Sequence, residues 1–190
     1  MKKIIVIAAM ALLTLTASAQ KIGRVNFNEL VQLMPEADAA RQTMQAASQE
    51  ADETLKSMYE EYQSKVTVYQ QKSSTWSASI KETKEKELYE IQQRLQEFQQ
   101  TVQQELQQQQ QQLMAPLYEK AQNTVRDLAK AKALTAVFDA SSALYFDEET
   151  TVDLTPEART ALGIAEGRTL ETLQQELAAE QAARESALQK

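Results

Sequence analysis

The sequence contains no cysteine and no histidine among its 190 residues. Without cysteine it can form no disulfide, offers no thiol nucleophile and cannot carry a lipid anchor on that residue. Without histidine it lacks the commonest general base and metal ligand. Carboxylates are abundant, but they stand beside Lys and Arg on expected helix surfaces, where solvated ion pairs are their usual role. We therefore expect no enzyme, no metal and no cofactor.

Glycine and large aromatic residues are also scarce, at three glycines and 6% aromatic residues. A spherical core built from so few large apolar groups would be thin, whereas long helices need to bury only a narrow seam. No glycine-rich phosphate loop and no serine elbow is present. The composition favours a mainly α-helical chain.

The charge balance excludes one class of partner. The net charge is -7, and removing the two lysines of the leader described below leaves -9. Nucleic-acid binders need a basic face to displace phosphate counterions. We expect no nucleic-acid partner.

The first nineteen residues have the features of an export signal. A basic start precedes the apolar stretch Ile4 to Leu15, which is too short to span a bilayer. Ala17-Ser18-Ala19 then supplies a small-x-small cleavage pattern, with Gln20 as the first mature residue. We predict a cleavable signal peptide over 1–19 and no stable membrane insertion afterwards. The alternative is an uncleaved membrane anchor.

The middle of the chain has a heptad-like apolar period in two runs separated by a serine-rich break at 73–79. The first run consists of Ala37, Ala40, Met44, Ala47, Ala51, Leu55, Met58, Tyr62, Val66 and Tyr69. The second consists of Leu88, Ile91, Leu95, Phe98, Val102, Leu106, Leu113, Leu117, Ala121, Val125 and Leu128. One antiparallel register sets Leu55 opposite Phe98, Met58 opposite Leu95 and Tyr62 opposite Ile91. We predict an antiparallel helical hairpin over 35–116, a coiled-coil arm with its tip near Trp76.

Two prolines lie at the root of this predicted hairpin. The register places Pro35 and Pro116 within about one helical turn of each other. Pro116 lies inside a helical pattern, where it removes a backbone hydrogen bond and favours a kink. We predict that the pair acts as a hinge.

Short strand-like segments occur near both ends of the chain: Ile22 to Phe27, Leu134 to Phe138, Leu144-Tyr145-Phe146 and, as a further candidate, Val152 to Leu154. So few short strands cannot form an independently stable sheet. Copies from other subunits would cover the open edges, so we expect oligomerisation. The last segment, 165–190, is predicted to be a polar tail that is partly helical or mobile.

The order of these segments resembles the Skp/OmpH family of periplasmic chaperones over roughly 21–164. The resemblance is carried by Ile22-Gly23-Arg24-Val25-Asn26-Phe27, the long hairpin, Val137-Phe138-Asp139-Ala140, Leu144-Tyr145-Phe146 and Asp153-Leu154-Thr155. It implies a periplasmic homotrimer with a small β-barrel body, formed here by 20–34 and 117–164. It also implies three hairpin arms around a cavity that holds unfolded outer-membrane proteins, without ATP.

The resemblance leads to two sets of candidate residues. The trimer body core would contain Val25, Phe27, Leu134, Ala136 and Phe138. Client contact would fall to Tyr69, Trp76 and Ile80 at the arm tip. The alternative for Trp76 is that it only packs the hairpin turn, since an aromatic side chain serves either purpose. Lysines and glutamates alternate at the tip, so we expect weak electrostatic steering of clients.

We therefore predict an ATP-independent holdase whose clients are unfolded outer-membrane β-barrel proteins. The alternative is a structural coiled-coil adaptor of the cell envelope that binds one folded partner. A membrane-surface protein is disfavoured by the acidic balance and the polar outer faces of the helices.

Overall fold

The computed structural model describes residues 21–188, and the predicted signal peptide, 1–19, lies outside the described residues. The chain divides into two compact units, with boundaries after Met34 and after Tyr118. Pro35–Tyr118 is here called the helical unit, and the described residues on either side of it form the sheet unit.

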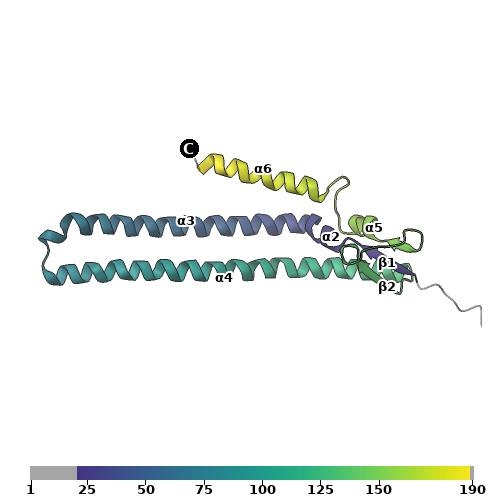
Figure 1. Ribbon diagram of the computed structural model, residues 1–190, viewed down its shortest axis with the longest axis horizontal. Helices are drawn as coiled ribbons and strands as arrows, with labels where there is room; N and C mark the ends of the chain where they lie inside the picture. The colour runs from purple at the N-terminus through teal and green to yellow at the C-terminus, as the bar shows by residue number, and fades with distance from the viewer. Residues whose placement is uncertain (1–20, 189–190) are drawn as a thin grey trace, which may run out of the picture. The chain divides into compact units, whose positions relative to one another are not determined.

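The helical unit contains α3, Pro35–Lys72, the short 3-10 helix η2, Ser73–Thr75, and most of α4, Ala78–Ala131 (Figure 1). Neither glycine nor an internal proline interrupts α3, and α4 continues through Pro116. Every residue of the two predicted apolar runs is buried or half-buried, with Ile91 and Leu95 only 1% and 6% exposed. The apolar period therefore marks the inward faces of the helices.

Three side-chain contacts fix how α3 and α4 pair within the helical unit. Lys65 pairs with Glu87, Gln92 Nε2 donates to the Tyr62 hydroxyl at 2.6 Å, and Gln99 Nε2 donates to the Tyr59 hydroxyl at 3.2 Å. Later residues of α3 thus meet earlier residues of α4. Gln92 is the sequence neighbour of Ile91, which the predicted register sets opposite Tyr62.

The sheet unit contains three short parallel strands in the order β2-β1-β3. These are β1, Ile22–Val25, β2, Ala136–Asp139, and β3, Thr151–Asp153. Ile22 is level with Ala136 on one side and with Thr151 on the other. Within residues 21–188 no further strand closes the sheet, so a single chain does not form the β-barrel that the resemblance implies.

Three sequence predictions for this unit are wrong in detail. Leu144-Tyr145-Phe146 is not a strand, because no strand within residues 21–188 pairs with it. Phe27 does not extend β1 but begins α2, Phe27–Leu33, because the Asn26 side chain caps that helix by accepting from Glu29 N at 3.3 Å. Leu134 lies before β2 rather than in it.

The core of the sheet unit is formed by α2, the residues that follow β3, and α5, Thr155–Ala161. Its residues that are at most 2% exposed are Leu30, Val31, Leu33, Met34, Leu154, Ala158 and Leu162, together with Ala121 of α4. The segment predicted to be partly helical or mobile contains α6, Leu170–Leu188, which contacts α2 and buries Leu173. Among residues 21–188, no helix is both long and apolar enough to cross a membrane.

Candidate interaction surfaces

An open apolar groove of about 510 Å³ lies in the sheet unit between the first two strands and the last turns of α4. All five residues predicted for the trimer body core line it: Val25, Phe27, Leu134, Ala136 and Phe138. Its opposite wall comes from α4, through Val125 and Ala129. The structure therefore brings together strand residues and helix residues that lie far apart in the sequence.

The groove is apolar inside and basic at its rim. Val25 is 3% exposed, whereas Phe138, on the edge strand β2, is 48% exposed. Arg126 and Lys130 of α4 also line the groove, and Arg126 makes only a 3.8 Å contact with its neighbour Asp127. Sequence analysis did not identify these α4 residues, although Arg126 and Lys130 stand four positions apart and therefore share one helix face.

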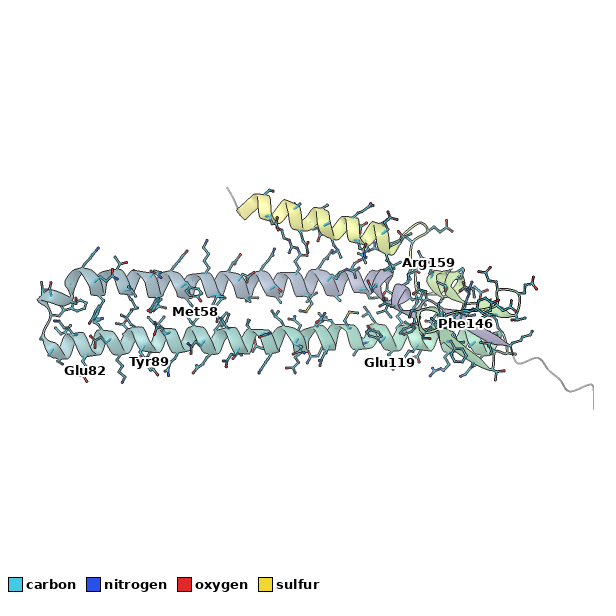
Figure 2. All side chains as sticks on the ribbon, viewed as in Figure 1. Met58, Glu82, Tyr89, Glu119, Phe146 and Arg159 are labelled. Carbon is cyan, nitrogen blue, oxygen red and sulfur yellow. The ribbon has the colours of Figure 1, made fainter. Side chains whose placement is uncertain are left out.

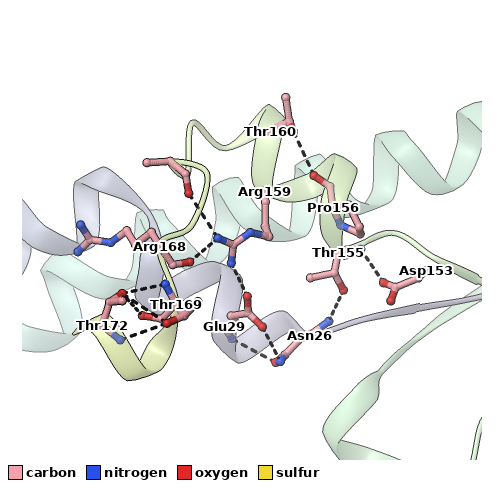
Figure 3. A network of polar contacts seen from close by, with 11 residues as sticks. Asn26, Glu29, Asp153, Thr155, Pro156, Arg159, Thr160, Arg168, Thr169 and Thr172 are labelled. Atoms are coloured by element: carbon pink, nitrogen blue, oxygen red, sulfur yellow. Dashed lines mark hydrogen bonds and ion pairs between the residues drawn. The ribbon is translucent and has the colours of Figure 1, made fainter. Parts of the chain in front are cut away.

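A polar network centred on Arg159 joins α2, α5 and the segment leading to α6 (Figure 3). The Arg159 guanidinium donates to the carboxylate of Glu29 and to the carbonyl of Arg168. Asn26 Nδ2 donates to the same Glu29 carboxylate at 2.8 Å, and Asn26 N donates to Thr155 Oγ1 at 3.0 Å. No short-range pattern in the sequence indicated this network, because Glu29 and Arg159 are 130 positions apart.

A second cavity, of about 660 Å³, lies beside this network. Four of the five charged residues in its lining pair with one another: Arg24 contacts Asp153 at 3.3 Å, and Arg159 contacts Glu29, whereas Glu166 is not part of these pairs. Over the described part of the chain, no group of acidic residues is arranged to hold a metal ion. These two pairs are accounted for as structural ion pairs.

At the end of the helical unit, Trp76 packs edge-on against Tyr69, with ring centroids 5.8 Å apart and planes at 67°. Both are half-buried and line a cleft of about 190 Å³, whereas Ile80, 47% exposed, is not part of that lining. The structure thus brings together two of the three predicted client-contact residues. This geometry supports the alternative that Trp76 packs the turn, while its half-exposed ring leaves a surface for contact.

Electrostatic pairing is strong at this cleft. The pKa of Glu87 is lowered to about 2 because Lys65 and Lys84 both donate hydrogen bonds to its carboxylate. The Tyr69 hydroxyl donates to Glu85, which raises the pKa of Tyr69. Because these lysines are engaged by glutamate, little unpaired positive charge is left at the cleft.

Several large apolar residues of the helical unit face solvent outside the predicted seam. Tyr59, Val68 and Tyr89 are 45%, 39% and 60% exposed, and Figure 2 labels Tyr89 on α4. Sequence analysis did not select them, although each is the sequence neighbour of a seam residue and could have been identified from that position. Together with Ile80 they give this unit a scattered apolar surface.

The proline pair lies next to the boundaries between the two units. Pro35 is the first residue of α3 and follows the first boundary directly, and Pro116 lies two positions before the second. Proline at the start of a helix costs no helical hydrogen bond, because a backbone N–H at that position would have no acceptor within the helix. Pro116, inside α4, does remove a helical hydrogen bond.

Comparison with known proteins gives a consistent assignment. A model of the family described as "Outer membrane protein (OmpH-like)" matches residues 21–162. The fold is similar to the crystal structure of a protein from Caulobacter crescentus CB15 described as a candidate OmpH-like outer membrane chaperone. That similarity has a TM-score of 0.68 at 14% identity and covers 76% of this chain and 85% of the other. No curated protein sequence matches this chain. Because the family model covers most of the sequence, the chain belongs to the OmpH-like family of outer membrane proteins.

Proposed function

We propose that this protein is an ATP-independent holdase chaperone of the periplasm that binds unfolded outer-membrane β-barrel proteins and prevents their aggregation. The observation that carries the proposal is membership of the OmpH-like family over residues 21–162. The similar fold of a candidate outer membrane chaperone supports it. The export signal predicted at 1–19 is consistent with a periplasmic location.

The working form in this proposal is a homotrimer whose body is completed by neighbouring copies. One chain provides an open three-stranded sheet with an exposed Phe138 on its edge strand. An open edge beside an apolar groove is a surface that proteins normally cover. The five candidate core residues, Val25, Phe27, Leu134, Ala136 and Phe138, would be covered in the trimer.

Clients would be held mainly by apolar contact and enclosure between the helical units. The lysines of the cleft near Trp76 are engaged by Glu87, so long-range attraction of acidic clients is weak. Exposed Ile80 and Tyr89 provide apolar contact area. Bending at Pro35 and Pro116 would adapt the spacing of the units to clients of different size.

The deciding experiment dilutes several unrelated outer-membrane β-barrel proteins from urea into buffer with or without the mature protein. A holdase suppresses light scattering for all of them without ATP, at similar molar ratios. A coiled-coil adaptor would leave their aggregation unchanged and would bind one folded envelope partner stoichiometrically. The second result would overturn the proposal.

A further inference from the structure

The segment between β2 and β3 contains the most exposed large apolar side chains of the described chain. Leu144 is fully exposed and Tyr145 is 81% exposed. Burial of a side chain of this size contributes about 1.5–3 kcal/mol of free energy. Neither of these two adjacent side chains gains that contribution while it stays in water. Leu144-Tyr145-Phe146, here called the apolar segment, has the composition of a strand but pairs with no strand in the part of the chain that the structure describes.

Acidic residues follow the apolar segment directly. Asp147, Glu148 and Glu149 come next in the sequence, and both glutamates are exposed. Glu148 makes a long contact of 3.8 Å with Arg24 and remains 83% exposed at its side chain. Large apolar side chains are therefore followed directly by negative charge along the chain.

The groove of the sheet unit has the complementary character. Its floor is apolar, through Val25, Leu134 and Val125, and its α4 rim carries Arg126 and Lys130. The one carboxylate in its lining, Asp139, already accepts hydrogen bonds from Ser141 N and Ser141 Oγ, both at 3.0 Å. A ligand with adjacent large apolar and acidic groups fits such a site.

We propose that the apolar segment of one subunit docks into the groove of the next, with the acidic residues that follow it, 147–149, against Arg126 and Lys130. Leu144, being fully exposed, does not occupy the groove of its own chain. Segment and groove are different patches of one chain, so the contact is head-to-tail and generates a ring when the rotation closes. This inference rests on the proposed homotrimer and specifies which residues hold it together.

The native chain lacks cysteine, so engineered thiols give a clean test. Leu144→Cys and Ala129→Cys are placed together in the full mature chain and treated with a short bis-maleimide. Denaturing gels should show cross-linked dimer and a closed higher species from the double variant, and only monomer from each single variant. Leu177→Cys with Ala129→Cys is the control, because Leu177 is also an exposed leucine, 36% exposed, but lies on α6.

Three results would overturn the docking, and they have different consequences. No cross-link in protein that sediments as a trimer would reject the segment-to-groove contact and leave the proposed homotrimer standing. Cross-linking of Leu144→Cys alone would show that the segments meet one another instead. A monomeric mass would reject the trimer itself, and the docking with it.

Substitution gives an independent measurement. Tyr145→Ser should raise the dissociation constant of the assembly about ten- to a hundred-fold, as expected for loss of an aromatic anchor, at unchanged helical content. Tyr89→Ser is the matched control, since Tyr89 is a similarly exposed tyrosine in the helical unit. Equal dissociation constants for the two variants would contradict the docking.

Discussion

Arg159 on α5 donates to the carboxylate of Glu29 on α2 and to the carbonyl of Arg168, so one guanidinium ties together three parts of the sheet unit (Figure 3). The Arg159 and Glu29 side chains are only 19% and 22% exposed. An ion pair that is this far buried and that has additional hydrogen bonds contributes more to the stability of the fold than an exposed surface pair does. Arg159 is therefore expected to help hold the segment that leads to α6 in place.

Arg159→Ala should lower the free energy of unfolding by about 1.5–3 kcal/mol, because it leaves the Glu29 carboxylate and the Arg168 carbonyl without this donor. Urea unfolding measures the loss, and hydrogen exchange should show faster exchange in Leu170–Leu188. Arg94→Ala is the control, because Arg94 is 57% exposed and contacts Glu61 at 3.7 Å. Equal stability of the two variants would contradict the role given to Arg159.

Gly23 in the central strand β1 is the second test of packing in the sheet unit. A Cβ at this position would lie 2.7 Å from Leu134 Cδ1 and 3.2 Å from Val137 Cγ2. Gly23→Ala should therefore destabilise the protein by about 1–2 kcal/mol through overpacking. The urea midpoint measures this effect. Gly167→Ala separates crowding from backbone strain, because nothing lies within 4 Å of its Cβ but its φ is +78°.

The long helices were predictable from the sequence because apolar residues recur every three or four positions without interruption. The seam residues of both runs are inward-facing in the structure, and Tyr62 pairs beside its predicted neighbour Ile91. Such periodicity is a local property of the chain.

The sheet unit was less predictable, because its contacts depend on residues far apart in the sequence. Leu144-Tyr145-Phe146 has strand composition but finds no strand partner among the described residues, and Asn26 ends β1 because it caps α2. The Arg159–Glu29 pair and the α4 wall of the groove depend on which elements meet in space. Three of the five predicted core residues, Val25, Ala136 and Phe138, share one groove because β1 pairs with β2. Phe27 and Leu134 line the same groove from two positions beyond the ends of these strands.

The pairing of Glu87 predicts how the stability of the helical unit changes with pH. Lys65 and Lys84 lower the pKa of Glu87 to about 2 from an ordinary value of 4.5. The stabilisation by this pairing is therefore fully present at pH values above 4.5, the pKa of Glu87 in the unfolded chain. It is lost as the pH falls from 4.5 toward the pKa of about 2 in the folded protein. Because the Glu87 side chain is 32% exposed, solvent screening limits the effect to about 0.5–1 kcal/mol.

Glu87→Gln should accordingly lower stability near neutral pH and make no difference near pH 2. Fluorescence of the single tryptophan, Trp76, which lines the same cleft, measures unfolding of the helical unit in urea. Glu105→Gln is the control, because Glu105 is an exposed glutamate of α4. A destabilisation by Glu87→Gln that stays constant down to low pH would contradict the pairing.

Trp76→Ala tests whether the tip residues contact clients. Loss of the edge-on contact with Tyr69 should cost about 0.5–1.5 kcal/mol of stability in either case. If Trp76 also contacts clients, the variant should capture an unfolded porin less well at unchanged helicity. Ile80→Ala is the matched variant, because Ile80 is exposed and outside the Tyr69–Trp76 cleft. Capture of the porin by Trp76→Ala at the wild-type level would reject client contact and leave the packing role.

Pro116→Ala tests the proposed hinge. Alanine restores the backbone donor that proline lacks inside α4, so the variant should be more stable by about 1–3 kcal/mol. A stiffer α4 should narrow the size range of unfolded β-barrel proteins that are kept soluble, with the largest clients lost first. Pro156→Ala is the control, because Pro156 lies in the first turn of α5, where the missing N–H has no helical partner. If Pro116→Ala is stabilised but keeps the full range of client sizes, proline limits only the stability of the helix and the hinge is rejected.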